Sequence, residues 1–140
     1  MTAATASPTP GQIHSLLAEG GYEVAETSPD SLTIRELDSG VAVHAVLQGD
    51  VLFLSLPCVT VPRSSITPEV MAKMLDAGNG ISTSFFQLYD AGKGKVAVAL
   101  NNFCKLQDMG PEDHDDILSC VHFLLVDVLE ARRLIGGLLQ

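Results

Sequence analysis

The chain has 140 residues, of which 46% are hydrophobic and 5% aromatic, and its 17 acidic and 8 basic residues give a formal net charge of −9. This length and apolar content suffice for one aliphatic core without a metal or a disulfide. The charge argues against nucleic acid and anionic membrane surfaces as partners, because both repel an acidic protein, and it favours a basic or amphipathic protein segment.

The first residues and the cysteines are typical of a cytoplasmic protein. Residues 1–8 contain neither the basic start nor the apolar run of a secretory signal, so we expect a disordered tail followed by a single α+β domain at residues 9–140. No apolar stretch reaches the roughly 18 residues that span a membrane. Three widely spaced cysteines, Cys58, Cys104 and Cys120, form no complete disulfide framework and fit a reducing compartment, where free cysteines pack as apolar residues.

The first half of the chain predicts one helix and four strands. Thr9 is a good cap for a helix that starts at Pro10. Alternating apolar residues predict strands at Tyr22–Thr27, Leu32–Leu37, Val41–Gln48 and Val51–Cys58. Gly49-Asp50 suits a two-residue hairpin of type II′, and Pro57 and Pro62 are expected to end the last strand. The pattern indicates an antiparallel meander with one buried face.

The second half predicts a helix, a hairpin and a long final helix. Thr67 caps a helix that begins at Pro68 and ends near Gly78. Strands are expected at Thr83–Asp90 and Lys95–Phe103, and the last helix at about 111–135. The order α-ββββ-α-ββ-α predicts an α+β fold in which helices pack on an antiparallel sheet.

The last helix has an apolar surface wider than one core requires. Its apolar arc covers about 240° of the helical wheel, whereas about 100° suffices for a helix that packs on one core. The second side packs either on the other helices of the chain or on a second copy, and we favour a homodimer. The expected interface residues are Val121, Leu124, Leu125, Val128 and Leu129.

No group of residues predicts a catalytic, cofactor or metal site. The segment His114–Asp116 places neighbours about 100° apart on a helix, so they cannot converge on one ion. With Asp113, it is interpreted as a solvated acidic cap at the positive end of the helix dipole. Cys58 or Cys104 could be a nucleophile only if the fold brought a histidine close, and no activating motif is present. We therefore expect no enzyme, and a small cysteine-dependent enzyme is the least favoured alternative.

Several segments have the order of elements and the pattern of apolar and polar residues of a known family. They are the helix Thr67–Ala77 ending at Asn79-Gly80, the strand Phe86-Gln87-Leu88, the run Val96–Leu100 and the long helix Asp113–Ile135. In these segments, and in the short helix and strands that precede them, the chain resembles the type III secretion chaperone-like superfamily, which includes the YbjN-like domains.

The resemblance implies an α/β sandwich that is often a dimer. Secretion chaperones of this superfamily wrap an extended, partly unfolded segment of a client, and the YbjN-like branch is associated with bacterial regulation or stress. We therefore expect a chaperone-like, protein-binding module without a cofactor, in which Phe53, Phe85 and Tyr89 are candidates to contact the client. The alternative is a YbjN-like regulatory or structural module that mainly associates with itself.

Overall fold

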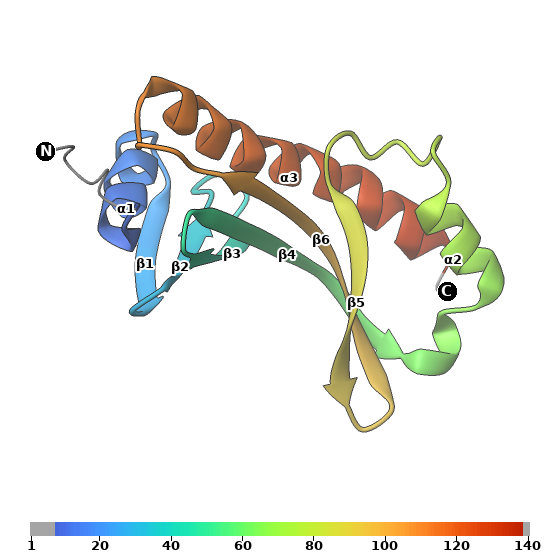
Figure 1. Ribbon diagram of the computed structural model, residues 1–140. Helices are drawn as coiled ribbons and strands as arrows, with labels where there is room; N and C mark the ends of the chain where they lie inside the picture. Colours follow the sequence, from blue (N-terminus) through green and yellow to red (C-terminus); the bar gives the residue numbers. More distant parts are fainter. Residues whose placement is uncertain (1–7, 139–140) are drawn as a thin grey trace, which may run out of the picture. The chain divides into compact units, whose positions relative to one another are not determined.

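The helices and strands follow the predicted order. The computed structural model describes residues 8–138 (Figure 1), so the predicted tail lies, apart from Pro8, outside the described residues. The elements are α1 (Pro10–Glu19), β1 (Glu23–Ser28), β2 (Ser31–Arg35), β3 (Ala42–Gln48), β4 (Val51–Pro62), the short 3-10 helix η1 (Arg63–Ser65), α2 (Pro68–Leu75), β5 (Phe85–Gly92), β6 (Lys95–Lys105) and α3 (Pro111–Leu138).

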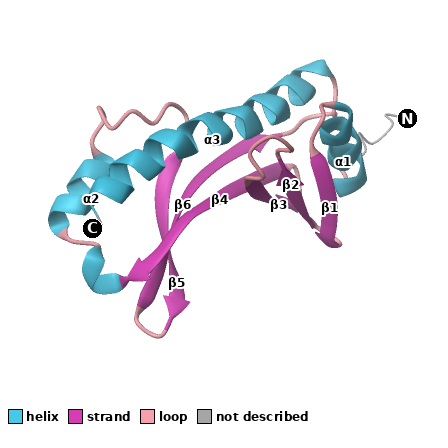
Figure 2. Cartoon of the chain, turned by 180° about the vertical axis from the view of Figure 1, so that it is seen from behind, coloured by secondary structure: helices cyan, strands magenta, loops and turns pink. Residues whose placement is uncertain are grey.

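The six strands belong to one antiparallel sheet. Their order is β1-β2-β3-β4-β6-β5, so the first four strands form a meander and β6 lies between β4 and β5 (Figure 2). Strands β1 and β5 are therefore the two edges of the sheet. The predicted α+β class, with helices and an antiparallel sheet, is confirmed.

The chain packs as two compact units. Unit 1 contains the chain up to Leu54 together with Phe103–His122, and unit 2 contains Ser55–Asn102 and the chain from Phe123 onward. Strands β4 and β6 and helix α3 contribute residues to both units. Each unit is described by itself below.

Unit 1 is built on alternating strands and the first helix. In β2 and β3 every second residue is buried, as predicted for strands with one face in a core. Helix α1 contacts β1 and β2 (Figure 1) and buries Ile13 and Leu17 completely. Its start is a capping box, in which the Thr9 hydroxyl accepts a hydrogen bond from the Gln12 N–H and the Gln12 side chain accepts one from the Thr9 N–H.

Unit 2 has its core under the second helix. Val70 and Met74 of α2, Val98 of β6 and Ile135 of α3 form a buried apolar cluster. The Thr67 hydroxyl caps α2 by accepting a hydrogen bond from the Val70 N–H at 3.2 Å, as the sequence predicted. The partly buried residues packed against this cluster are Cys58, Ile66 and Phe86.

Strand β4 is longer than predicted. It was expected at Val51–Cys58 and continues to Pro62, so it ends at the second of the two prolines that were expected to close the meander. Because β3 has 7 residues and β4 has 12, the last part of β4 extends beyond its hairpin partner. At the hairpin, Gly49 has a φ of 63°, as the first position of the predicted type II′ turn requires.

Candidate protein-binding surfaces

Strand β5 is an exposed edge with aromatic side chains. All of its residues are exposed except Phe86, which is half-buried. Phe85 and Tyr89, two of the three predicted client-binding residues, are 46% and 42% exposed. Within the described residues β5 pairs only with β6, so its other side has main-chain groups available to a further strand.

A polar cluster fixes the position of Tyr89. In the register of the hairpin Phe85 pairs with Asn101 and Tyr89 with Ala97, so Phe85, Gln87 and Tyr89 point to the same face as Asn101. The Asn101 amide is 8% exposed and donates hydrogen bonds to Gln87 Oε1 and Tyr89 Oη. Tyr89 Oη in turn donates to Gln87 Oε1 at 3.1 Å. The tyrosine ring is thereby held in place at the edge, which lowers the entropy that binding would cost.

The third predicted client-binding residue, Phe53, lies in unit 1. It is 45% exposed and packs against Phe103, with ring centroids 6.3 Å apart and an angle of 38° between the rings. The structure therefore brings Phe85 and Tyr89 together on one strand and gives Phe53 a different neighbour. Phe103, which is also exposed, was not predicted as part of any surface.

Most of the predicted dimer-interface residues are buried within the chain. Val121, Leu124, Leu125 and Val128 belong to the core, and only Leu129 is exposed, at 64%. These four side chains of α3 are thus buried by contacts within the chain itself. Among the α3 residues whose burial is described, the large exposed apolar side chains lie on the opposite side of the helix, at spacings of three residues. They are Phe123, Val126 and Leu129, here called the outer stripe.

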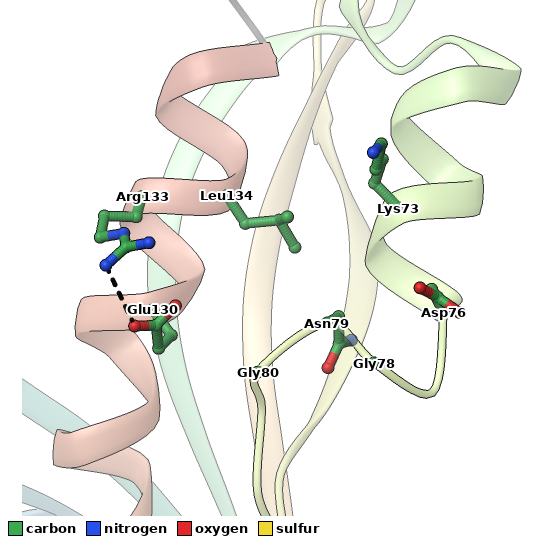
Figure 3. Close-up of a pocket in the computed structure, with 8 residues that line it drawn as sticks. All are labelled: Lys73, Asp76, Gly78, Asn79, Gly80, Glu130, Arg133 and Leu134. Carbon is green, nitrogen blue, oxygen red and sulfur yellow. Dashed lines mark ion pairs between the residues drawn. The ribbon is translucent and has the colours of Figure 1, made fainter.

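A pocket of about 580 Å³ lies in unit 2 between α2, the loop after it and α3 (Figure 3). Its charged side chains are two cations and two carboxylates, and Arg133 pairs with Glu130 at 3.5 Å. Leu134 points across the pocket toward the side of Lys73 (Figure 3). The pocket residues are Lys73, Asp76, Gly78, Asn79, Gly80, Glu130, Arg133 and Leu134. The balanced charges favour no single ion as a ligand.

Two buried carboxylates of α3 bind loop backbone. In unit 1, Asp113 Oδ2 accepts hydrogen bonds from the N–H groups of Gln107 and Met109 at 2.8 and 2.7 Å. The prediction of a solvated cap was wrong for Asp113, which is 3% exposed, because the preceding loop folds back over it. Met109 has a φ of 58°, a left-handed conformation that non-glycine residues rarely adopt.

In unit 2 the corresponding carboxylate is Asp127. Its Oδ1 accepts hydrogen bonds from the Ser82 N–H at 3.0 Å and the Ser82 hydroxyl at 2.8 Å, and its Oδ2 accepts one from the Ser84 N–H at 3.3 Å. Burial by itself raises the pKa of Asp127, but the hydrogen bonds from Ser82 and Ser84 outweigh burial and hold the pKa below its ordinary value. Asp127 thus fixes the segment that leads directly into β5. The only feature of the sequence that could have predicted this role is the position of Asp127, a single acidic residue within an apolar stretch of the last helix.

Cys58, His14 and His44 each have different neighbours in the structure. Cys58 is half-buried, its thiol donates to the Leu56 carbonyl at 3.7 Å, and burial raises its pKa. His14 contacts Glu26, and His44 contacts Thr33. Among residues 8–138 no three His, Cys, Asp or Glu side chains are grouped to hold a metal ion. None of the helices formed by these residues is both long and apolar enough to cross a bilayer.

The fold is similar to that of a solved protein. YbjN from E. coli, a candidate transcription regulator known from its crystal structure, superimposes with a TM-score of 0.66 over 90% of this chain and 93% of its own. The two sequences are 16% identical, so the likeness shows the fold alone. No protein-family model and no curated protein matches the sequence. The predicted YbjN-like fold is confirmed.

Proposed function

We propose that the chain is a protein-binding, chaperone-like module that takes up an extended segment of a partner along the edge of β5. The observation that supports this most is an edge strand whose main chain is accessible and whose aromatic side chains are exposed. An added strand would gain main-chain hydrogen bonds, and alternate side chains would meet Phe85 and Tyr89 on one face.

The composition of β5 favours an edge strand that binds a partner segment over one that only faces solvent. Natural edge strands are usually protected by lysines, prolines or inward-pointing charges. The sequence Phe85–Gly92 contains no lysine and no proline, and Asp90 is its one charged residue. The net charge of −9 makes a basic or neutral client segment more favourable than an acidic one.

Hydrogen exchange with model clients tests this proposal. The probes are a panel of ten-residue peptides that alternate apolar with lysine or serine residues, together with reduced, carboxymethylated α-lactalbumin. We expect at least one probe to protect the β5 amides. The double variant Phe85→Ser/Tyr89→Ser should weaken that binding by about tenfold or more, since each exposed aromatic anchor contributes on the order of 1 kcal/mol.

Phe53→Ser is the matched control, because Phe53 is equally exposed but lies in unit 1. It should change binding less than twofold. A panel in which no probe protects the β5 amides would contradict the proposal, and equal losses for the two variants would place binding elsewhere.

Self-association as a regulatory module is the second candidate function. It is favoured by the outer stripe of α3, where Val126 and Leu129 are exposed, and by the likeness to a candidate transcription regulator. Because the chain is acidic, we propose that such a role would act through protein contacts and not through DNA.

Light scattering over a range of concentrations tests the second candidate. A dimer through the outer stripe should dissociate in the variant Val126→Glu/Leu129→Glu. Leu75→Glu, at an exposed apolar position of α2 in the same unit, should leave the mass unchanged. A monomeric mass for the unmodified chain at every concentration would contradict self-association.

A further inference from the structure

Two cysteines from different elements, a strand and a helix, lie near each other in unit 1. Cys104 lies in β6 and Cys120 in α3, and their thiols are close enough for each to shift the pKa of the other. The Cys120 thiol also donates to the Phe103 carbonyl at 3.9 Å, so its side chain lies directly against the end of β6. Both cysteines are free thiols in this structure.

The two thiols are chemically unequal. Cys104 is buried at 8% exposure, whereas Cys120 is half-buried and closer to solvent. Interaction with the Cys104 thiol lowers the pKa of Cys120 despite burial and the nearby Asp116. The same interaction, burial, and the Asp116 and Asp113 carboxylates raise the pKa of Cys104. Cys120 is therefore the better nucleophile, and Cys104 is placed to attack second.

We propose that Cys104 and Cys120 form an oxidation site, which closes into an intramolecular disulfide on reaction with a low-molecular-weight disulfide such as oxidised glutathione. The Cys120 thiolate attacks one sulfur of that disulfide, forms a mixed disulfide and releases one thiolate. Cys104 then loses its proton to solvent, attacks Cys120 Sγ and releases the second thiolate. Two protein thiols are oxidised, and one small disulfide is reduced to two thiols.

The new bond would join β6 to α3 within unit 1. It closes a loop that contains the turn held by Asp113 and removes conformations from the unfolded chain. We expect the thermal unfolding midpoint to rise by roughly 5 to 10 °C on oxidation. Cys58, which belongs to unit 2, serves as an internal control thiol.

Peptide mapping of the full chain tests the proposal directly. Trypsin places the three cysteines in different peptides, residues 36–63, 96–105 and 106–132. After incubation with graded mixtures of reduced and oxidised glutathione, the non-reduced digest should contain the 96–105 peptide linked to the 106–132 peptide. The 36–63 peptide should remain unlinked, and dithiothreitol should reverse the change.

Single variants separate the roles of the three thiols. Cys58→Ser should retain the linked peptides and the shift in unfolding midpoint, whereas Cys120→Ser should lose both. Cys104→Ser should trap a glutathione adduct on Cys120 and form it several times faster than on Cys58. Absence of the linked peptides from the unmodified chain at every ratio overturns the proposal, as do equal reaction rates at Cys120 and Cys58.

Discussion

The two edge strands of the sheet differ in how well their unpaired main-chain groups are protected from pairing with another chain. Strand β1 in unit 1 carries Glu23 and Glu26, has a register shift near its end and contacts helix α1. Strand β5 in unit 2 carries Phe85, Leu88 and Tyr89, all of which are exposed. Charges and bulges prevent unwanted pairing of an edge, whereas exposed aromatic residues favour it. The difference supports the proposal that a partner segment adds to β5 and not to β1.

The two units are also alike in one stabilising contact, a buried aspartate of α3. Both units use a buried aspartate of α3 to bind loop N–H groups, Asp113 in unit 1 and Asp127 in unit 2. Asp113 binds the loop before its own helix, while Asp127 binds the segment just before Phe85. The conformation of β5 therefore depends on a tertiary contact to which β1 has no connection.

Removal of Asp127 should have the largest effect. Asp127→Ala leaves the Ser82 and Ser84 N–H groups without their acceptor, and we expect a loss of about 2–4 kcal/mol in the free energy of unfolding. Urea denaturation measures the loss, and hydrogen exchange should show faster opening of β5 than of β1. Asp113→Ala is the control and should speed exchange near Gln107 first. Equal acceleration at β1 and β5 in the Asp127 variant would break the comparison.

Exchanging the chemistry of the two edges should have an intermediate effect. Phe85→Lys gives β5 a protective charge and should reduce the binding of extended peptides by about tenfold, with a stability change below about 1 kcal/mol. Glu23→Val in β1 removes a protective charge and should increase concentration-dependent association in light scattering. If β1 tolerates that change without association, contact with α1 alone protects this edge.

Local signals predicted the elements, but not the contacts between them. Thr9 and Thr67 marked helix starts because capping is decided within four residues. The exposure of Phe85 followed from strand alternation. The helical wheel of α3 could not distinguish a side packed inside the chain from a side packed on a second copy, so Val121 and Val128 were assigned to an interface and lie in the core. The pairing of Cys104 with Cys120 depends on the tertiary register of a helix on a strand, for which the sequence has no local signal.

The depressed pKa of Asp127 predicts a specific pH dependence. Since this pKa lies below the ordinary value of 3.8 in the folded chain, the ionised carboxylate stabilises the fold above about pH 4, and this contribution is lost as the pH falls through the folded pKa. The difference in urea midpoint between the unmodified chain and Asp127→Asn should be constant from pH 5 to 7. It should shrink below about pH 4. A difference that grows on acidification would contradict the assignment.

The smallest expected effect is the loss of stability when a surface ion pair is removed, and each unit has one such pair to compare. In unit 1 His14 of α1 meets Glu26 of β1 at 3.3 Å, and in unit 2 Glu130 meets Arg133 one turn along α3 at 3.5 Å. Glu26→Gln and Glu130→Gln should each cost at most about 0.5 kcal/mol in urea denaturation. Glu26→Gln should cost more, because its pair ties a helix to the protected edge and its histidine is less exposed than Arg133. About 1 M salt should remove most of both effects, since screening then acts over about 3 Å. An effect of Glu26→Gln that survives such salt would mean that Glu26 protects β1 through packing and not through its charge.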